Sequence, residues 1–164
     1  MNLDRKDILL LESLQEDASR KLEDLARMVH LAPSSVHDRL RRLRQDRVIR
    51  RWTVDVEPGA LGLNVEAFIG IRASLPCAEV VKHLASIPAI ETCQSVAGAL
   101  SLMLRVRVGH PGDLMDLTEM LRSVPGIEST ETTIVLKTHL DRPVQSPSST
   151  APLKAKICRC PNRH

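Results

Sequence analysis

The sequence predicts an α+β protein built from two dissimilar parts, and three observations lead to this fold class. Up to residue 53, apolar residues recur three or four positions apart, which is the period of an α-helix. From Leu63 onward they alternate, which is the period of a β-strand, and two helical patterns interrupt the alternation. Basic residues are concentrated in one stretch: seven arginines fall between Arg39 and Arg51, whereas the whole chain has a formal net charge of only +3. We therefore predict an N-terminal helix-turn-helix unit of the winged-helix-like type, followed by a C-terminal ferredoxin-like βαββαβ unit.

Residues 1–53 are expected to form three short helices. The first pattern runs from Leu3 to Asp17, the second from Lys21 to Met28, and the third begins at Pro33. The connection between the second and third patterns is short, as it is in a helix-turn-helix.

The third helix has one apolar side and one polar, arginine-rich side. Val36, Leu40 and Leu43 stack on the first side at helical spacing. Arginine can donate two hydrogen bonds to guanine or pair with phosphate, so such a helix suits the major groove of DNA, although a solvated surface helix has the same charge pattern. We expect Arg41 and Arg42 in the groove, and Arg39 at the edge of the core. The predicted DNA-binding residues are Ser34, Ser35, His37, Asp38, Arg41, Arg42, Arg50 and Arg51, the last two on phosphates.

Both ends of this helix depart from the preferred pattern. Ala32 stands at the N-cap position and provides no capping oxygen, while Pro33 is a favourable first helical residue. Arg47 stands where the helix should end, and we expect it in a left-handed conformation that costs about 1 kcal/mol.

Residues 54–62 are predicted to be a linker strand, because Trp52, Val54 and Val56 alternate before the turn formers Pro58 and Gly59. Residues 63–140 then read as strand, helix, strand, strand, helix and strand. If both helices cover one face of the sheet, the other face combines apolar and charged residues and is a candidate surface for self-association. The predicted elements contain Val65–Ala73, Val80–Ile87, Ile90–Val96, Leu102–Val108, Leu114–Leu121 and Thr130–Leu136.

Both halves resemble one family of prokaryotic transcription factors, the leucine-responsive/asparagine regulators (Lrp/AsnC). In residues 1–53, the similarity rests on Leu3-Asp4, Leu25-Ala26, the run Leu31-x-Pro-Ser-Ser-Val36, and Val48-Ile49. In the second half it rests on Leu61-Gly62-Leu63, Val96-x-Gly98, Pro125-Gly126-Ile127 and Thr130-Glu131-Thr132. The resemblance implies a regulator that binds double-stranded DNA as a homodimer or higher homo-oligomer, with a ligand-sensing second domain. It also implies that the linker strand pairs with the same strand of a second subunit.

A turn in the second half bears on the ligand. Members of the family usually have Gly-x-x-Asp there, at an amino-acid pocket between subunits, whereas this chain has Gly98-Ala99-Leu100-Ser101. A carboxylate would pair with a ligand ammonium group, and serine offers only a neutral hydroxyl. Gly98, Ala99 and Ser101 are the predicted effector-binding residues, and whether a free amino acid binds at all stays open.

The remaining sequence argues against several other classes. Aromatic residues make up 1% of the chain, which disfavours recognition of single-stranded nucleic acid by base stacking. Neither a signal peptide nor a membrane-spanning run is recognisable, so we expect a cytoplasmic protein. Residues 141–164 are rich in proline and serine and are predicted to be a disordered tail. Its Cys158, Cys160 and His164 lack the spacing of a zinc module, and we expect no metal or cofactor.

Two alternatives to a sequence-specific regulator stay open. One is an architectural DNA-binding protein that tolerates any sequence and has no effector. The other is an enzyme, since a branch with the same build resembles sirohaem decarboxylases. This chain has no tyrosine, and the histidines available between the predicted strands of its second half are His83 and His110.

Overall fold

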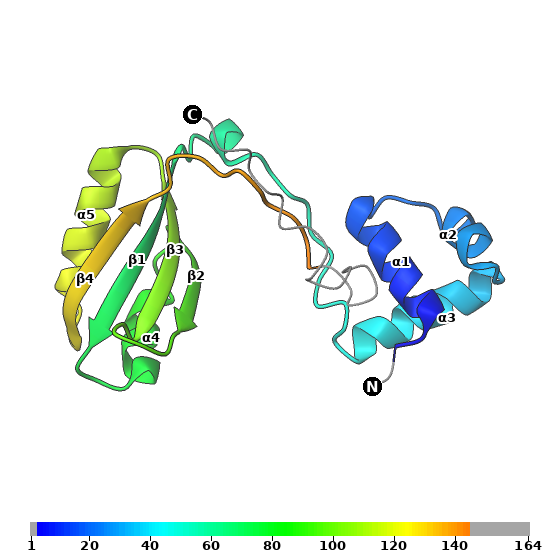
Figure 1. The fold of residues 1–164 in the computed structure, drawn as a ribbon, viewed down its shortest axis with the longest axis horizontal. Coiled ribbons are helices and arrows are strands. Elements are labelled where there is room, and N and C mark those ends of the chain that lie inside the picture. Colours follow the sequence, from blue (N-terminus) through cyan, green and yellow to red (C-terminus); the bar gives the residue numbers. More distant parts are fainter. Residues whose placement is uncertain (1–2, 145–164) are drawn as a thin grey trace, which may run out of the picture. The chain divides into compact units, whose positions relative to one another are not determined.

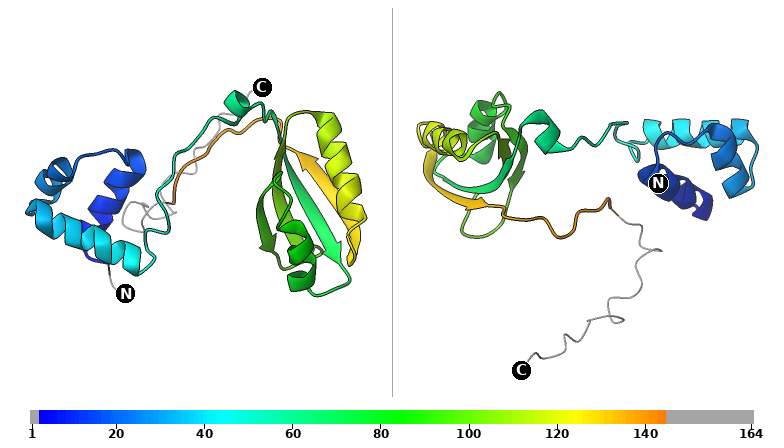
Figure 2. Two further views of the ribbon diagram at one scale, coloured as in Figure 1. Left: turned by 180° about the vertical axis from the view of Figure 1, so that it is seen from behind. Right: turned by 90° about the horizontal axis from the view of Figure 1, so that it is seen from above.

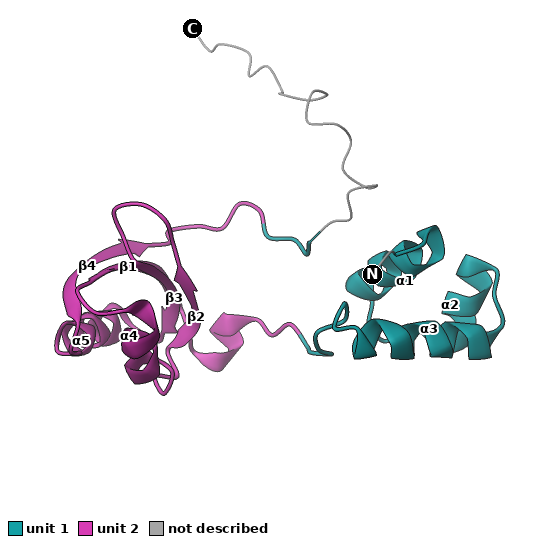
Figure 3. Cartoon of the chain, turned by 90° about the horizontal axis from the view of Figure 1, so that it is seen from below, with its two compact units in different colours: residues 1–54, 141–164 teal, residues 55–140 magenta. Residues whose placement is uncertain are grey.

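The computed structural model describes residues 3–144. The chain divides into two compact units, which Figure 3 shows in different colours. The first runs to Val54 and takes in the segment from Asp141, and the second spans Asp55–Leu140. The tail predicted to be disordered lies almost entirely outside the described residues, as do Cys158, Cys160 and His164.

The first unit contains the three predicted helices: α1 (Arg5–Glu16), α2 (Leu22–Val29) and α3 (Pro33–Gln45) (Figure 1). Helix α1 starts with a reciprocal capping box, in which the Asp4 side chain accepts from the Asp7 N–H and the Asp7 side chain accepts from the Asp4 N–H. The apolar sides of the helices meet in a small core. Its buried members are Leu10, Leu14, Leu25, Ala26, Val29 and Val36.

The predicted linker strand is not formed within the single chain described. Residues 51–57 have no regular secondary structure, and the next element is a short 3-10 helix, η1 (Pro58–Leu61). Alternation describes which side chains share a face, but a strand also needs a neighbouring backbone to bond with. No described residue of the chain forms strand pairing with this segment. Its pairing with the same segment of a second subunit, which the family resemblance implies, stays a prediction.

The second unit is the predicted ferredoxin-like plait. Its four strands lie in the order β2-β3-β1-β4, and all neighbours are antiparallel. Both helices of this unit cover the same face of the sheet (Figures 1 and 2). In chain order the elements are β1 (Val65–Ala73), α4 (Cys77–Leu84), β2 (Ile90–Ser95), β3 (Leu102–Val108), α5 (Pro111–Arg122) and β4 (Ile127–Ile134).

The core of this unit lies between the sheet and its helices. Ala67, Ile69 and Ile71 of β1 alternate into it, and the helices add five buried residues. Those are Val80, Leu84, Leu114, Leu117 and Leu121, which all lay in predicted helical patterns. On the other face, Phe68 is opposite Arg105 and Gly70 is opposite Met103, which gives the mixed apolar and charged surface that the sequence predicts.

The last strand ends earlier than the sequence predicts. Strand β4 begins at Ile127 and ends at Ile134, so the predicted Leu136 lies beyond the strand and is 95% exposed. Leu136 lies beyond the strand because the pairing of β4 with β1 ends at Ala67 and Ile134.

No helix within residues 3–144 has the length and apolar character that crossing a membrane requires.

Candidate nucleic-acid interface and effector turn

Helix α3 is oriented by its apolar side. Val36 and Leu43 are fully buried and Leu40 is partly buried against the core, as their helical spacing predicts. The helix begins at Pro33, and Ala32 before it makes no side-chain capping bond. Because its buried side is fixed, the opposite side must face solvent.

All eight predicted DNA-binding residues are exposed on or just after this helix. Asp38 lies 3.0 Å from the Arg41 guanidinium and 3.9 Å from the His37 ring. Asp38 therefore offsets part of the charge that Arg41 would present to a phosphate. The exposed residues are Ser34, Ser35, His37, Asp38, Arg41, Arg42, Arg50 and Arg51.

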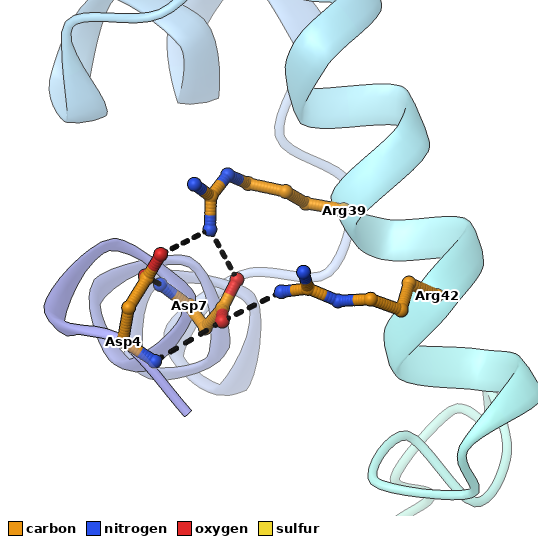
Figure 4. Close-up of polar contacts among 4 residues, drawn as sticks. All are labelled: Asp4, Asp7, Arg39 and Arg42. Carbon is orange, nitrogen blue, oxygen red and sulfur yellow. Dashed lines mark hydrogen bonds and ion pairs between the residues drawn. The ribbon is translucent and has the colours of Figure 1, made fainter. Parts of the chain in front are cut away.

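Two arginines of α3 are held by carboxylates of α1 (Figure 4). Arg39 donates to Asp4 at 2.6 Å and to Asp7 at 2.8 Å, so it lies at the core edge as predicted. Arg42 donates to the other oxygen of Asp7, also at 2.8 Å. Backbone bonding from Asp7 and the Arg39 guanidinium lower the pKa of Asp4, and the same pairing with Asp4 and Asp7 raises the pKa of Arg39. Arg42 is thus already engaged within the protein, which the prediction of a simple groove contact did not anticipate.

Asp7 is the residue that the sequence analysis missed. Its side chain is 1% exposed, although it carries a carboxylate. The signal was present, because Asp7 is spaced three and seven residues before Leu10 and Leu14, on the same side of α1. A carboxylate at a buried helical position requires partners, and arginines from another helix are the natural ones.

The end of α3 has the predicted left-handed residue. Arg47 has φ +56°, and the N–H groups of Val48 and Ile49 both donate to the Leu43 carbonyl. A second left-handed residue, His30 with φ +51°, ends α2 and forms the helix-turn-helix connection. Arg50 and Arg51 follow in a segment without regular structure.

The predicted effector turn connects β2 to β3 and is tied to β1. The Ser101 N–H donates to the Ile71 carbonyl at 2.8 Å, and the Ser101 hydroxyl oxygen accepts from the Ala73 N–H at 3.1 Å. Gly98 has φ +138°, and both Gly98 and Ala99 are exposed. The structure therefore brings these predicted residues together at one end of the sheet, with Ser101 part-buried and the other two at the surface.

The first unit is a three-helix unit whose helix-turn-helix exposes arginines on its second helix, and a ferredoxin-like unit follows it. This combination defines a class of DNA-binding transcription regulators. Comparison with known proteins supports this class. Residues 3–44 match the AsnC-type helix-turn-helix domain, and residues 66–145 match the Lrp/AsnC ligand binding domain. The chain belongs to the Lrp/AsnC family of transcriptional regulators.

Named relatives span nearly the same length. The HTH-type transcriptional regulator FL11 of Pyrococcus horikoshii is 33% identical over 138 residues, which are 84% of this chain and 91% of the relative. The regulator LrpA of Mycobacterium tuberculosis is also 33% identical over 138 residues, covering 83% of this chain and 91% of its own.

Solved structures agree. Escherichia coli AsnC superposes with a TM-score of 0.82 at 26% identity, covering 88% of this chain and 99% of that one. The feast or famine regulatory protein of M. tuberculosis was solved in complex with L-methionine. It superposes with a TM-score of 0.80 at 32% identity, covering 85% of this chain and 96% of that one.

Proposed function

We propose that this regulator inserts α3 into the major groove of double-stranded DNA and reads base edges with the exposed side of that helix. One observation carries the proposal. Burial of Val36 and Leu43 fixes the helix so that Ser34, Ser35, His37, Asp38 and Arg41 face outward together. Side chains on one side of one helix can reach adjacent base pairs in the major groove.

The individual roles follow from chemistry. Arg41 suits guanine, which offers two acceptors to one guanidinium, and Asp38 suits the amino group of cytosine. Arg50 and Arg51 lie just past the helix and are assigned to phosphates, which contribute affinity without sequence information.

We further propose that the protein acts as a homodimer or higher homo-oligomer. The helix-free face of the sheet supports this, because Phe68 is 40% exposed there and Met103 lies on the same face. Two copies related by a two-fold axis would present two α3 helices, and their half-sites would be separated by whole turns of DNA.

An amino-acid effector is the third part of the proposal. It is supported by the relative solved with L-methionine and by the turn that contains Gly98, Ala99 and Ser101. The Ser101 hydroxyl oxygen accepts from the Ala73 N–H and still has its own proton to donate to a ligand. A hydroxyl donor matches the carboxylate of an amino acid, whereas the aspartate usual in the family matches the ammonium.

The test is selection of genomic DNA fragments by the protein, repeated with each free amino acid and accompanied by native mass measurement. We expect the selected fragments to share a palindromic site, and one amino acid to shift affinity or assembly. The double variant Arg50→Ala/Arg51→Ala should weaken binding to all fragments and flatten the salt dependence by about 2 in slope. Arg122→Ala is the control, because Arg122 is an exposed arginine in the second unit. This variant should bind DNA as the wild type does.

Other results would redirect the proposal. A shared site that no amino acid affects would overturn only the effector part. A steep salt slope with equal affinity for all fragments would instead identify an architectural DNA-binding protein.

A further inference from the structure

The cluster formed by Asp4, Asp7, Arg39 and Arg42 divides the arginines of α3 into two groups. Both oxygens of the Asp7 carboxylate are used, one by Arg39 and the other by Arg42 and the Asp4 N–H. Two carboxylates face two guanidinium groups, so the cluster carries no net charge (Figure 4). Arg39 and Arg42 therefore contribute less attraction to DNA than their number suggests.

The two arginines are held to different degrees. Arg39 makes bonds to two carboxylates and its side chain is 25% exposed. Arg42 makes one carboxylate bond and its side chain is 49% exposed. Arg39 is a fixed structural partner, whereas Arg42 is positioned to exchange its carboxylate for an acceptor on DNA.

Such an exchange is costly because of where Asp7 lies. A buried carboxylate that loses one of its charged partners is left less compensated in a medium of low polarity. Only an acceptor that meets the Arg42 guanidinium with good geometry repays that loss. A phosphate in an arbitrary position does not.

We propose that Asp7 is a specificity-determining positioning residue, which keeps Arg42 on α1 in complexes with arbitrary DNA and releases it only at a matching site. This inference rests on the proposed groove binding of α3. Specificity is a difference between two affinities, and Asp7 increases that difference by weakening the unwanted complex.

The first experiment compares Asp7→Asn with the wild type on two DNA probes. One probe is a duplex that the wild type selects from genomic fragments, and the other is a shuffled duplex of the same composition. We expect Asp7→Asn to bind the shuffled duplex more tightly than the wild type, and the ratio of the two affinities to fall at least about fivefold. The salt slope on the shuffled duplex should rise by about 1, because one more phosphate is neutralised.

The matched control is Glu16→Gln. Glu16 is an exposed carboxylate at the far end of α1, and it pairs with Arg20 rather than with an arginine of α3. This substitution makes the same charge change and also releases one arginine. It should leave the affinity ratio at the wild-type value, and an equal fall in both variants would show that net charge alone is responsible.

A purely structural role for Asp7 gives the opposite sign. If Asp7 only holds the helices together, Asp7→Asn weakens binding to both probes, and this outcome overturns the proposal. Thermal unfolding by circular dichroism identifies a variant that has lost its fold.

The second experiment does not depend on the Asp7 variant folding. Arg42→Gln leaves the buried Asp7 paired with Arg39, and should weaken binding to the selected duplex while leaving the shuffled duplex unaffected. Equal weakening on both probes would contradict the proposal. In the double variant, Arg42→Gln should also abolish the gain that Asp7→Asn gives on the shuffled duplex, a coupling that a double-mutant cycle measures.

The two levels of proposal fail differently. A wild type that selects no fragment would defeat the proposed function before Asp7 is tested. A wild type that selects a site, with unchanged ratios in both variants, would defeat the role of Asp7 alone.

Discussion

The first unit, here called the helical unit, and the second unit (Asp55–Leu140), the sheet unit, hold their proposed functional residues in place by different means. In the helical unit, side-chain carboxylates of α1 hold arginines of α3. In the sheet unit, Ser101 donates from its N–H to the Ile71 carbonyl and accepts at its hydroxyl from the Ala73 N–H, and these bonds to the backbone of β1 hold the turn. Charge pairs respond to salt and pH, and backbone bonds do so far less. The surface that we propose for DNA is therefore sensitive to salt and pH, while the turn proposed for the effector keeps its geometry.

The two units also differ in the size of their cores. The helical unit buries six apolar residues in its core cluster and the sheet unit buries twelve. The same loss of packing therefore removes a larger share of stability from the helical unit.

The largest expected effect comes from Leu10→Ala, which removes a fully buried side chain from the smaller core. We expect a loss of about 2–5 kcal/mol in the free energy of unfolding of the helical unit. Calorimetry should then show the transition of the helical unit at lower temperature and the sheet unit unchanged. Ile69→Ala, also at a fully buried site, should shift the other transition instead. A single transition shifted by both variants would show that the units do not unfold separately.

A smaller effect is expected from Gly126→Ala at the start of β4. Gly126 has φ +87°, and an added Cβ would lie 2.7 Å from a methyl carbon of Leu75. Strain and crowding together should destabilise the sheet unit by about 1–3 kcal/mol, measured by urea unfolding. The control is Gly112→Ala in the first turn of α5, where an added Cβ meets nothing within 4 Å and should not destabilise. Equal losses at both positions would contradict the argument.

Arg47→Gly should act in the opposite direction on stability. Glycine adopts φ +56° without steric strain, so we expect the helical unit to gain about 1 kcal/mol. The same change removes a cation next to α3, and DNA affinity should fall with a shallower salt slope. His30→Gly relieves similar strain at φ +51° and leaves every arginine in place. If His30→Gly weakens DNA binding as much as Arg47→Gly does, the guanidinium of Arg47 has no part in binding.

The smallest effect is the acid sensitivity of the helical unit. The pKa of Asp4 is lowered from its ordinary value of 3.8, first by the Asp7 N–H and then by Arg39. A lowered pKa in the folded state means that the stabilisation is complete above pH 3.8 and is lost as the pH falls through the lowered value. Unfolding measured between pH 2 and about 5 should show this loss, and Asp4→Asn should reduce it. An identical pH profile in the variant would exclude Asp4 as its source.

The fold was predictable because its signals are local. The spacing of Leu10 and Leu14, the alternation along Val65–Ala73 and the breaks at Pro125-Gly126 each concern residues close together in sequence. Helix α3 was predictable for the same reason, including its buried side and the left-handed Arg47.

What the sequence did not reveal depends on pairing between distant segments. Asp7 and Arg42 are 35 residues apart, and only the packing of α1 on α3 brings them together. Residues 51–57 look like a strand because Trp52, Val54 and Val56 alternate, yet a strand exists only with a bonded neighbour. The tie between Ser101 and Ala73 likewise joins positions 28 apart. The turn proposed for the effector was chosen by family resemblance, whereas the bonds that fix it required the structure.

One property of the segment after α3 makes the molecule easy to observe. The chain contains a single tryptophan and no tyrosine, so almost all of its ultraviolet-excited emission comes from Trp52. That indole is 45% exposed, in a stretch without regular structure between the helical unit and η1. Any event that covers it will move the emission to shorter wavelength. The unlabelled protein thus carries its own optical reporter at the junction between its two parts.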